Sequence, residues 1–534
     1  MTTYSRPGVF INELPLSAAP IEGAAAATAA GAVIAAFAQG PEKVTKVTSW
    51  YDFSRRFGGY NKQYPATFEV ASFFKNGGTD LYVRRILPAN ATKATAVVPI
   101  NDEGAGNLLG LRAKNRGKDG NDIRVKFTKS NLVKQSGYWD LSVYVEGATS
   151  ATSDDILVEQ FNGIVFNDAD SSDYIENILS FNSNYIEVNP AVEVDVEDTY
   201  GPVTTLIPLS GATTPESEIL YEDYTGDDTG SDGEAPNTLT PANASVFQEF
   251  EVIDQPLVFF LPDATSRLGW GEASSVYNLL TAWAETNTSV VVVETAAGLE
   301  PVAAMTAAND LTPSSRAAVY YPHVYIQDPL GKSSAAVRKM GPSGAVAGLY
   351  IYTDTKSGPF KTPAGVDARV QDAIALERAF TPRELDQLND GVTSEGVSLA
   401  NVNVVRNLPG AGIVVMGGRT TLQDGTANRY INMRRSLIYV EKRLRDLLQF
   451  AVFENNTEVL WARINTVLGA FLNEYRNQGG LRGTTPAASF FVKCDEENNP
   501  QASIAAGEVH VEVGVALEYP TEFVVINLSQ KTAE

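Results

Sequence analysis

The chain has 534 residues and a net charge of −23, with 44% hydrophobic and 20% charged residues, a composition typical of globular proteins built from several domains. It contains one cysteine, Cys494, and two histidines, His323 and His510, so neither an internal disulfide nor a zinc site of the Cys/His type can form. The same shortage of histidine argues against a serine or cysteine catalytic triad, and we expect no cofactor.

The negative charge is concentrated in one segment. Residues 135–266 contain 26 Asp and Glu and no Lys or Arg, and the rest of the chain has a net charge of only +3. A segment of this charge repels nucleic acid and anionic membranes, so neither is expected as a partner. Short strand patterns alternate there with polar turn clusters, and we expect residues 93–250 to form an acidic, β-rich outer insertion in contact with water.

The first residues of the chain have the pattern of an extended arm. Residues 4–14 predict a strand after a Pro-Gly break, and Pro15 and Pro20 bracket a linker, so residues 1–22 are interpreted as a strand arm with its linker. The apolar run at residues 23–38 is shorter than the about 20 residues that span a bilayer, and we expect no membrane insertion. The apolar residues of the arm strand are Val9, Phe10 and Ile11.

A middle α/β domain is expected in two parts, residues 23–92 and 251–375. The first part mixes strand and helix signals and ends in an apolar-basic strand at residues 81–87. In the second part, residues 257–262 and 289–294 are β-rich apolar runs with a helical pattern between them. This strand-helix-strand order is typical of an α/β layer.

The clearest local signals lie in residues 376–518, which we interpret as an inner C-terminal α/β domain. Two helices are predicted, over residues 429–453 and 457–478, and the apolar residues of the second form a one-sided stripe. Asn455, with Glu458 three residues later, has the pattern of a capping box. Because only a tight turn separates the helices, they should pack as an antiparallel hairpin.

Strands follow these helices. Residues 509–517 alternate between apolar and other side chains, which predicts a strand with one buried face, and residues 489–494 can pair with it as a β-hairpin. A two-stranded sheet is marginal in water and would gain from added strands. After Pro520, an apolar run within residues 519–534 predicts a second terminal strand arm. The receptor residues are Val509, Val511, Val513 and Val515, and the arm residues are Phe523, Val524, Val525 and Ile526.

The first C-terminal helix carries basic residues opposite its leucines. Between Arg429 and Arg482 there are nine basic and five acidic residues, in a strongly acidic chain. A helical wheel places several basic residues on one face, which is either simply solvated or binds an acidic partner. The candidate contact residues are Arg435, Lys442, Arg443 and Arg445.

Two motifs are similar to catalytic loops but are incomplete. Gly331-Lys332-Ser333 lacks the glycine that a phosphate-binding loop needs at position 326, which is Ile326. Ser343, in a Gly-Pro-Ser-Gly-Ala sequence, lacks the final glycine of a nucleophile elbow. Neither motif supports an enzyme, although the 64 acidic residues leave open a carboxylate pair for glycan cleavage.

Several blocks of sequence stand out in residues 1–90 and 330–534. They are Arg6-Pro-Gly-Val-Phe-Ile-Asn-Glu13, residues 49–59 (SWYDFSRRFGG), residues 73–85 (FFKNGGTDLYVRR), residues 341–365 beginning GPSGAVAG, residues 408–419 (LPGAGIVVMGGR), and the helical segments 430–435 (YINMRR) and 460–463 (LWAR). In this order they resemble the tail sheath family of contractile bacteriophages and related injection machines. The acidic segment has no such match, which fits a family whose members carry unrelated insertions in a shared core.

The resemblance implies a multidomain α+β and α/β fold and a structural role without a catalytic site. Members of the family stack as hexameric rings around a tail tube, and strand arms from neighbouring subunits complete a small sheet in each subunit. Contraction drives the tube through the host cell envelope for genome delivery. The implied partners are other copies of the chain, the tail tube protein, which the basic helix face would contact, and baseplate and tail terminator proteins. The implied location is the tail of a virion assembled in the host cytoplasm.

Two alternatives remain at this stage. A bacteriocin-like or secretion-type contractile injection particle would use the same kind of subunit. A glycan-cleaving tail enzyme belongs to a different class of function. Electron microscopy separates the classes, because a sheath subunit forms long hollow tubes whereas the enzyme would remain monomeric and degrade polysaccharide.

Overall fold

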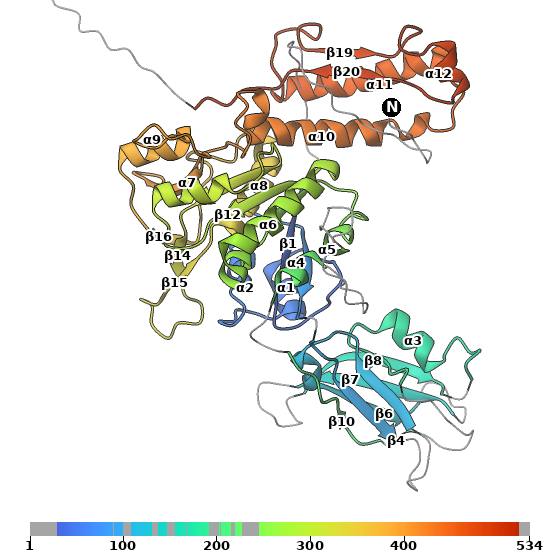
Figure 1. Cartoon of the computed structure of the whole chain (residues 1–534). Coiled ribbons are helices and arrows are strands. Elements are labelled where there is room, and N and C mark those ends of the chain that lie inside the picture. Colours follow the sequence, from blue (N-terminus) through green and yellow to red (C-terminus); the bar gives the residue numbers. More distant parts are fainter. Residues whose placement is uncertain are drawn as a thin grey trace, which may run out of the picture. The chain divides into compact units, whose positions relative to one another are not determined.

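The computed structural model describes residues 29–88, 90–99, 108–130, 137–146, 155–166, 168–191, 202, 204–214, 219–226 and 245–522. The chain divides into two compact units (Figure 1). Unit 1 consists of Met1–Val33, Phe68–Tyr82 and Asn237–Glu534, and unit 2 of Ile34–Thr67 and Val83–Pro236. The six-segment domain layout expected from the sequence is a finer division than these two units and stays a prediction.

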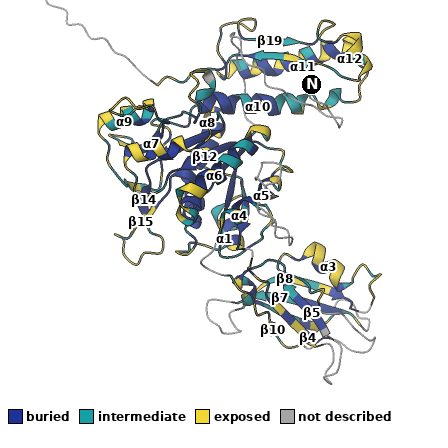
Figure 2. Ribbon diagram, viewed as in Figure 1, coloured by how far each residue is buried: buried dark blue, intermediate teal, exposed yellow. Residues whose placement is uncertain are grey.

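Unit 1 is built on a largely parallel sheet of apolar strands (Figure 1). In the order in which they lie side by side, its strands are β18 (Gly412–Met416), β17 (Asn403–Leu408), β13 (Ala317–Tyr321), β12 (Val290–Glu294), β11 (Leu257–Phe260) and the first residues of β1 (Ala30–Ala36). The neighbours β1, β11, β12 and β13 are parallel, and β18 is antiparallel to β17. Every residue of these four parallel strands is buried, as Figure 2 shows, because helices cover the sheet.

The strand-helix-strand order predicted for the middle of the chain is confirmed. Helix α6 (Ala264–Thr286) connects β11 to β12, and the two strands are parallel. The apolar pattern of the sequence predicts a helix from residue 274, but the helix begins at Ala264. Its first turn is separated from the rest by Gly269, whose φ of 75° lies in the left-handed region that glycine tolerates.

Helix α8 (Ser343–Ser357) lies close against helix α2 (Ala66–Lys75) because two of its residues have no side chain. A Cβ atom at Gly344 would stand 2.3 Å from the backbone oxygen of Glu69, and a Cβ atom at Gly348 would stand 2.4 Å from that of Phe73. The two glycines are four residues apart and therefore lie on the same helix face. The sequence block that begins at Gly341 thus has a packing reason.

The remaining elements of this part of unit 1 are short. A three-stranded antiparallel sheet has the order β15 (Val337–Met340), β14 (Val324–Gln327), β16 (Ala373–Leu376). The helices are α5 (Ser245–Gln248), α7 (Pro301–Asn309) and α9 (Pro382–Asp390). Helix α9 begins at a complete capping box, in which Thr381 and Glu384 each accept a backbone hydrogen bond from the other.

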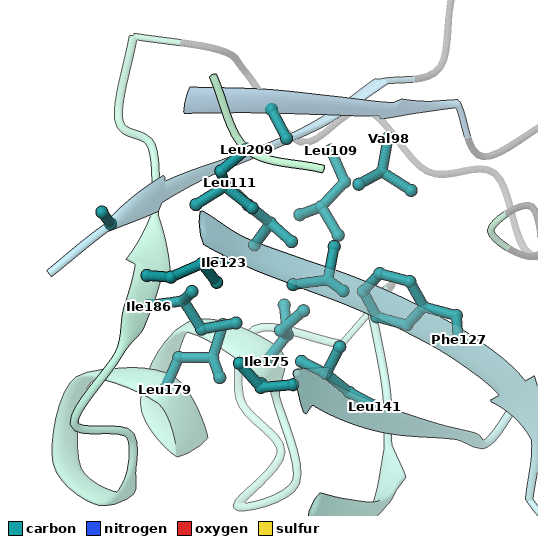
Figure 3. Close-up of a cluster of buried hydrophobic side chains, with 14 of the residues drawn as sticks. Val98, Leu109, Leu111, Ile123, Phe127, Leu141, Ile175, Leu179, Ile186 and Leu209 are labelled. Carbon is teal, nitrogen blue, oxygen red and sulfur yellow. The ribbon is translucent and has the colours of Figure 1, made fainter. Parts of the chain in front are cut away.

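Strands predominate in the described residues of unit 2. One antiparallel sheet has the order β10 (Ile207–Pro208), β6 (Ile123–Lys129), β7 (Trp139–Val145), β8 (Ile156–Ile164), and another has the order β4 (Thr95–Pro99), β5 (Leu108–Ala113), β9 (Ile186–Val188). The other elements are β2 (Thr45–Val47), α1 (Trp50–Phe57), most of β3 (Leu81–Ile86), α3 (Ile175–Asn182) and α4 (Tyr221–Thr225). Alternate residues of β5 and β6, among them Leu109, Leu111, Ile123 and Phe127, form one core with α3 (Figure 3).

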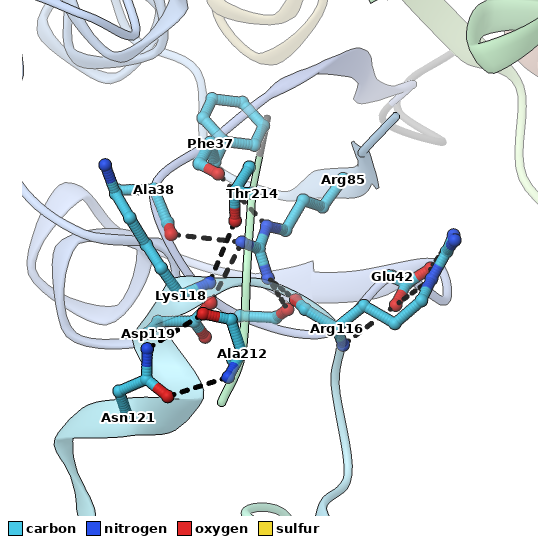
Figure 4. Close-up of polar contacts among 11 residues, drawn as sticks. Phe37, Ala38, Glu42, Arg85, Arg116, Lys118, Asp119, Asn121, Ala212 and Thr214 are labelled. Atoms are coloured by element: carbon cyan, nitrogen blue, oxygen red, sulfur yellow. Dashed lines mark hydrogen bonds and ion pairs between the residues drawn. The ribbon is translucent and has the colours of Figure 1, made fainter. Parts of the chain in front are cut away.

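A fully buried arginine organises the polar interior of unit 2. Arg85 has no exposed surface, and its guanidinium donates hydrogen bonds to the carbonyl oxygens of Phe37 (3.0 Å), Ala38 (3.0 Å) and Gly40 (2.7 Å) and to Asp119 (3.2 Å) (Figure 4). One side chain therefore connects the segment after β1 with the segment before β6. The planar guanidinium can donate in all of these directions, which a lysine ammonium could not do with the same geometry.

Candidate functional site

The C-terminal part of unit 1 contains the predicted helical hairpin. Helices α10 (Ile431–Leu447) and α11 (Glu458–Asn477) run side by side in opposite directions (Figure 1). Their shared core includes Tyr439 and Val440 of α10 and Phe471, Leu472 and Tyr475 of α11. The predicted hairpin is confirmed, and its first helix ends earlier than expected.

A two-stranded antiparallel sheet lies on this hairpin, as predicted. Strand β19 (Phe490–Lys493) pairs with β20 (Glu512–Val515), so that Phe490 is opposite Val515 and Phe491 is opposite Gly514. Phe490 and Val515 belong to the core with the helices. Among the described residues, neither strand has another neighbour within a sheet. The sheet is therefore covered by helices on one face and has edges that can accept further strands.

The outer face of this small sheet is partly covered by its own aromatic residue. A Cβ atom at Gly514 would stand 2.0 Å from the ring of Phe491, so the ring lies directly over the glycine. Phe491 is 49% exposed. Any residue larger than glycine at position 514 would displace the Phe491 ring from this face.

The receptor strand is shorter than the alternation of the sequence indicates. Val513 and Val515 lie in β20, but Val509 and Val511 precede it and belong to no strand, which corrects the prediction for these two residues. The backbone at this point is already bonded, because Asn499 donates to the carbonyl oxygen of His510 (2.9 Å) and accepts from its N–H (2.6 Å). Val509 and Val511 are still half-buried against α11.

The end of the described chain is fastened to the start of the hairpin. Glu522 receives two hydrogen bonds from the Arg419 guanidinium, at 3.0 and 2.6 Å, in the bidentate geometry of strong arginine–carboxylate pairs. Asn432 donates to the carbonyl oxygen of Glu518 (3.2 Å), and the rings of Tyr430 and Tyr519 are in contact. Nothing in the sequence indicated this anchor beyond the position of Arg419 at the end of one of the sequence blocks.

The basic residues of α10 do not form the exposed face predicted by the helical wheel. Arg435 is 4% exposed and forms an ion pair with Asp354 of α8, and Lys442 is 7% exposed and pairs with Asp254 and Asp446. Both residues thus form their ion pairs within unit 1. Figure 2 shows that the first half of α10 is buried on all sides, which is why a wheel based on one apolar stripe is misleading.

The other two candidates on α10 remain accessible in part. Arg443 and Arg445 are half-buried, and the Arg443 guanidinium lies 5.8 Å from the centre of the Phe471 ring. Their role as a contact surface stays a prediction.

The arm residues lie outside the described part of the chain. They are Val9, Phe10, Ile11, Phe523, Val524, Val525 and Ile526. Within the described residues, no cluster of His, Cys, Asp and Glu has a geometry suited to a metal ion, and no helix is long and apolar enough to cross a membrane. Burial raises the pKa of the Cys494 thiol to about 11, so this side chain is unreactive near neutral pH.

Comparisons with known proteins point to one family. Residues 423–531 match the family described as the phage tail sheath C-terminal domain. The tail sheath protein of Vibrio phage KVP40 is 28% identical over 190 residues, which are 35% of this chain. The matched region spans about a quarter (26%) of that relative's length. These findings confirm the resemblance that the sequence blocks indicated.

Solved structures share the fold over almost the whole chain. A sheath tail protein from Listeria innocua covers 93% of this chain with a TM-score of 0.58 and 14% identity. The sheath of the anti-feeding prophage, solved as a helical sheath in the contracted state, covers 99% with a TM-score of 0.55 and 18% identity. At these identities the likeness concerns the fold.

Proposed function

We propose that this chain is the structural subunit of a contractile tail sheath, because residues 423–531 match the phage tail sheath C-terminal domain family. It polymerises as stacked hexameric rings around a tail tube, and its contraction drives the tube through the host cell envelope for genome delivery. The observation that carries the proposal is the two-stranded sheet β19–β20, which is covered by helices on one face and has edges open to further strands. The subunit acts by assembly and has no catalytic role.

Neighbouring subunits supply the missing strands. The N-terminal arm (residues 1–14) of one copy and the C-terminal arm (residues 521–530) of another add to the edges of β19 and β20. Strand addition derives affinity from main-chain hydrogen bonds and selectivity from alternate side chains. The anchor between Arg419 and Glu522 supports this arrangement, because it fixes the point at which the C-terminal arm leaves the subunit.

The domain layout follows from the same assembly. Residues 376–518 form the inner domain near the tube, residues 23–92 and 251–375 the middle domain, and residues 93–250 an outer insertion. The net charge of −26 in residues 135–266 supports an outer position, since like charges repel when they are packed into a ring. The partners are the tail tube protein, the baseplate and the tail terminator, and the particle is the tail of a virion.

A truncation after Glu522 tests the arm mechanism. It removes residues 523–534 and keeps every contact of the described anchor, so the variant should fold and remain soluble without forming sheaths. The matched control removes only residues 531–534 and should polymerise as the full chain does. Negative-stain electron microscopy distinguishes tubes from isolated subunits. Tubes of normal length from the variant that lacks residues 523–534 would refute the arm mechanism.

A second experiment tests the contact with the tube. Replacing Arg443 and Arg445 by glutamate should reduce co-sedimentation with an acidic tube, and the effect should weaken as salt is raised. The control is the same change at Arg463, whose exposed guanidinium lies on α11, 4.1 Å from the Phe450 ring. Equal tube binding by the α10 variant and the control would show that α10 does not provide the contact.

A contractile injection particle other than a phage is the second candidate. The anti-feeding prophage sheath shares the fold over 99% of this chain, which favours this candidate. The genome neighbourhood discriminates between them, because a phage tail requires capsid and genome-packaging genes beside the sheath gene and a free particle does not.

A further inference from the structure

Two glutamates are buried together in the interior of unit 1. Glu69 lies on α2 and is 2% exposed, and Glu294 is the last residue of β12 and is 1% exposed. Neither residue belongs to the assembly surfaces. Acidic side chains are almost never buried to this degree without a compensating partner.

The hydrogen-bond donors to these carboxyl groups are neutral. All come from the start of α8: Ser343 Oγ donates to Glu69 Oε2 (2.7 Å), the N–H groups of Gly341 and Gly344 donate to Glu69 (3.1 and 3.2 Å), and the N–H of Ser343 donates to Glu294 (3.3 Å). Three segments that are distant in sequence therefore meet at the two carboxyl groups. A Cβ atom at Gly341 would stand 1.9 Å from Glu294 Oε2, so only glycine fits there.

No cation among the described residues forms an ion pair with either glutamate. The ionisable groups on the neighbouring segments do not compensate a negative charge. Tyr277 of α6 interacts with both carboxyl groups, Asp263 lies near it and is paired with Arg267 (2.6 Å), and Asp372 accepts a hydrogen bond from Ser72, one turn along α2 from Glu69. The two glutamates thus face each other without a counter-charge.

The two carboxyl groups lie next to each other, because both accept hydrogen bonds from the same short segment, residues 341–344. Two ionised carboxylates in one buried site without a counter-charge would repel each other, so at least one of the two groups retains a proton. We propose that Glu69 and Glu294 share a proton and act as a proton-dependent clamp that holds α2, β12 and the start of α8 together. Loss of the shared proton places two negative charges in the same buried site, and the three segments then repel each other.

The direction of the pH dependence follows from the burial. Burial raises the pKa of Glu69 to about 7, and burial and the neighbouring Glu69 charge raise the pKa of Glu294 well above its usual value. Both pKa values are higher in the folded state than in the unfolded chain. The stabilising contribution is therefore complete below the ordinary glutamate pKa of 4.5 and is lost as the pH rises through about 7.

The test compares variants across pH. In Glu294→Gln, the amide keeps the shape of the side chain and donates to Glu69 at every pH. Between pH 5 and 7 the unfolding equilibrium constant of the wild type should rise by at least about 10- to 100-fold, as expected when the folded state retains one proton or more that the unfolded chain releases. The rise should be smaller in Glu294→Gln, because the variant has lost one of the two carboxyl groups whose pKa is raised while Glu69 stays buried. The control, Glu272→Gln on the exposed face of α6, should follow the wild type.

Two results would overturn the proposal. One is the same pH dependence in Glu294→Gln as in the Glu272→Gln control. The other is an infrared spectrum of the wild type near neutral pH without the carbonyl stretch of a protonated carboxyl group. The spectrum is measured on the unmodified protein and so decides the matter even if Glu294→Gln does not fold; where the variant folds, the band should become weaker in its spectrum.

Discussion

The ion pair between Arg435 and Asp354 gives the sharpest test of how α10 is held in unit 1. The side chains are each 4% exposed, and Arg435 also donates to the carbonyl oxygen of Tyr350 (3.1 Å) and lies over the Tyr350 ring. The change Arg435→Met keeps the aliphatic bulk and removes the charge. It leaves Asp354 buried without its partner, and the removal of one member of a buried ion pair costs about 3–5 kcal/mol.

The loss should depend on pH. Burial raises the pKa of Asp354 even beside Arg435, and without the arginine the carboxyl group will be protonated over a wider range. A raised carboxyl pKa stabilises the folded state below the unfolded pKa of about 3.9 and loses this contribution as the pH rises. The destabilisation by Arg435→Met should therefore be larger at pH 7 than at pH 5.

A double-mutant cycle isolates the pair. Urea unfolding of the full chain is measured for Arg435→Met, Asp354→Asn and the double variant, with hydrogen exchange of peptides from α8 and α10 to locate the effect. The double variant should be destabilised by less than the sum of the single variants. Arg443→Met on the same helix is the control and should cost no more than about 1 kcal/mol. Additive effects, or equal losses for Arg435→Met and the control, would refute the reasoning and return Arg435 to the tube-contact hypothesis.

Three further outcomes are expected. Gly348→Ala should destabilise unit 1 by about 1–3 kcal/mol in urea unfolding, because its Cβ meets a backbone atom of α2, whereas Gly271→Ala, where no atom lies within 4 Å, should be neutral or slightly stabilising. Arg85→Met should lower the stability of unit 2 by about 3–5 kcal/mol, measured by hydrogen exchange in β6 and β7; unchanged exchange would contradict this. Glu522→Gln should weaken the bond to Arg419 by about 1 kcal/mol and increase proteolysis near residue 519, unlike Glu518→Gln.

The elements with strong local periodicity were predictable from the sequence. The hairpin of α10 and α11 and the parallel strands β11 and β12 follow from apolar spacing alone. The predicted capping box of α11 was wrong. Thr457, not Asn455, is the residue that precedes the helix, and the Thr457 side chain makes no capping hydrogen bond. The neighbouring Asn456 accepts a hydrogen bond from the Trp461 ring (2.8 Å) and donates one to the carbonyl oxygen of Glu508 (2.9 Å). The second contact spans 52 residues and leaves no local signal.

In the candidate site, too, contacts between residues distant in sequence could not be predicted from local patterns. The burial of Arg435 depends on Asp354, which lies 81 residues earlier in the chain, and a helical wheel contains no information on such a partner. Residues 509–511 have the side-chain alternation of a strand, but the side chain of Asn499 occupies the backbone of His510. In both cases periodicity indicated correctly which side chains are apolar, and a contact with a distant residue decided what the remaining groups do.

The anchor at Glu522 has a mechanical consequence. A pull on the chain beyond this residue first meets two parallel hydrogen bonds to Arg419, which must break together and therefore resist more force than two bonds broken in succession. The next contacts upstream are the bond from Asn432 to Glu518 and the ring contact between Tyr430 and Tyr519, all at the start of α10. Tension applied there is directed into the start of α10 before it can reach β20, so the small sheet is shielded from being pulled apart by its own tail.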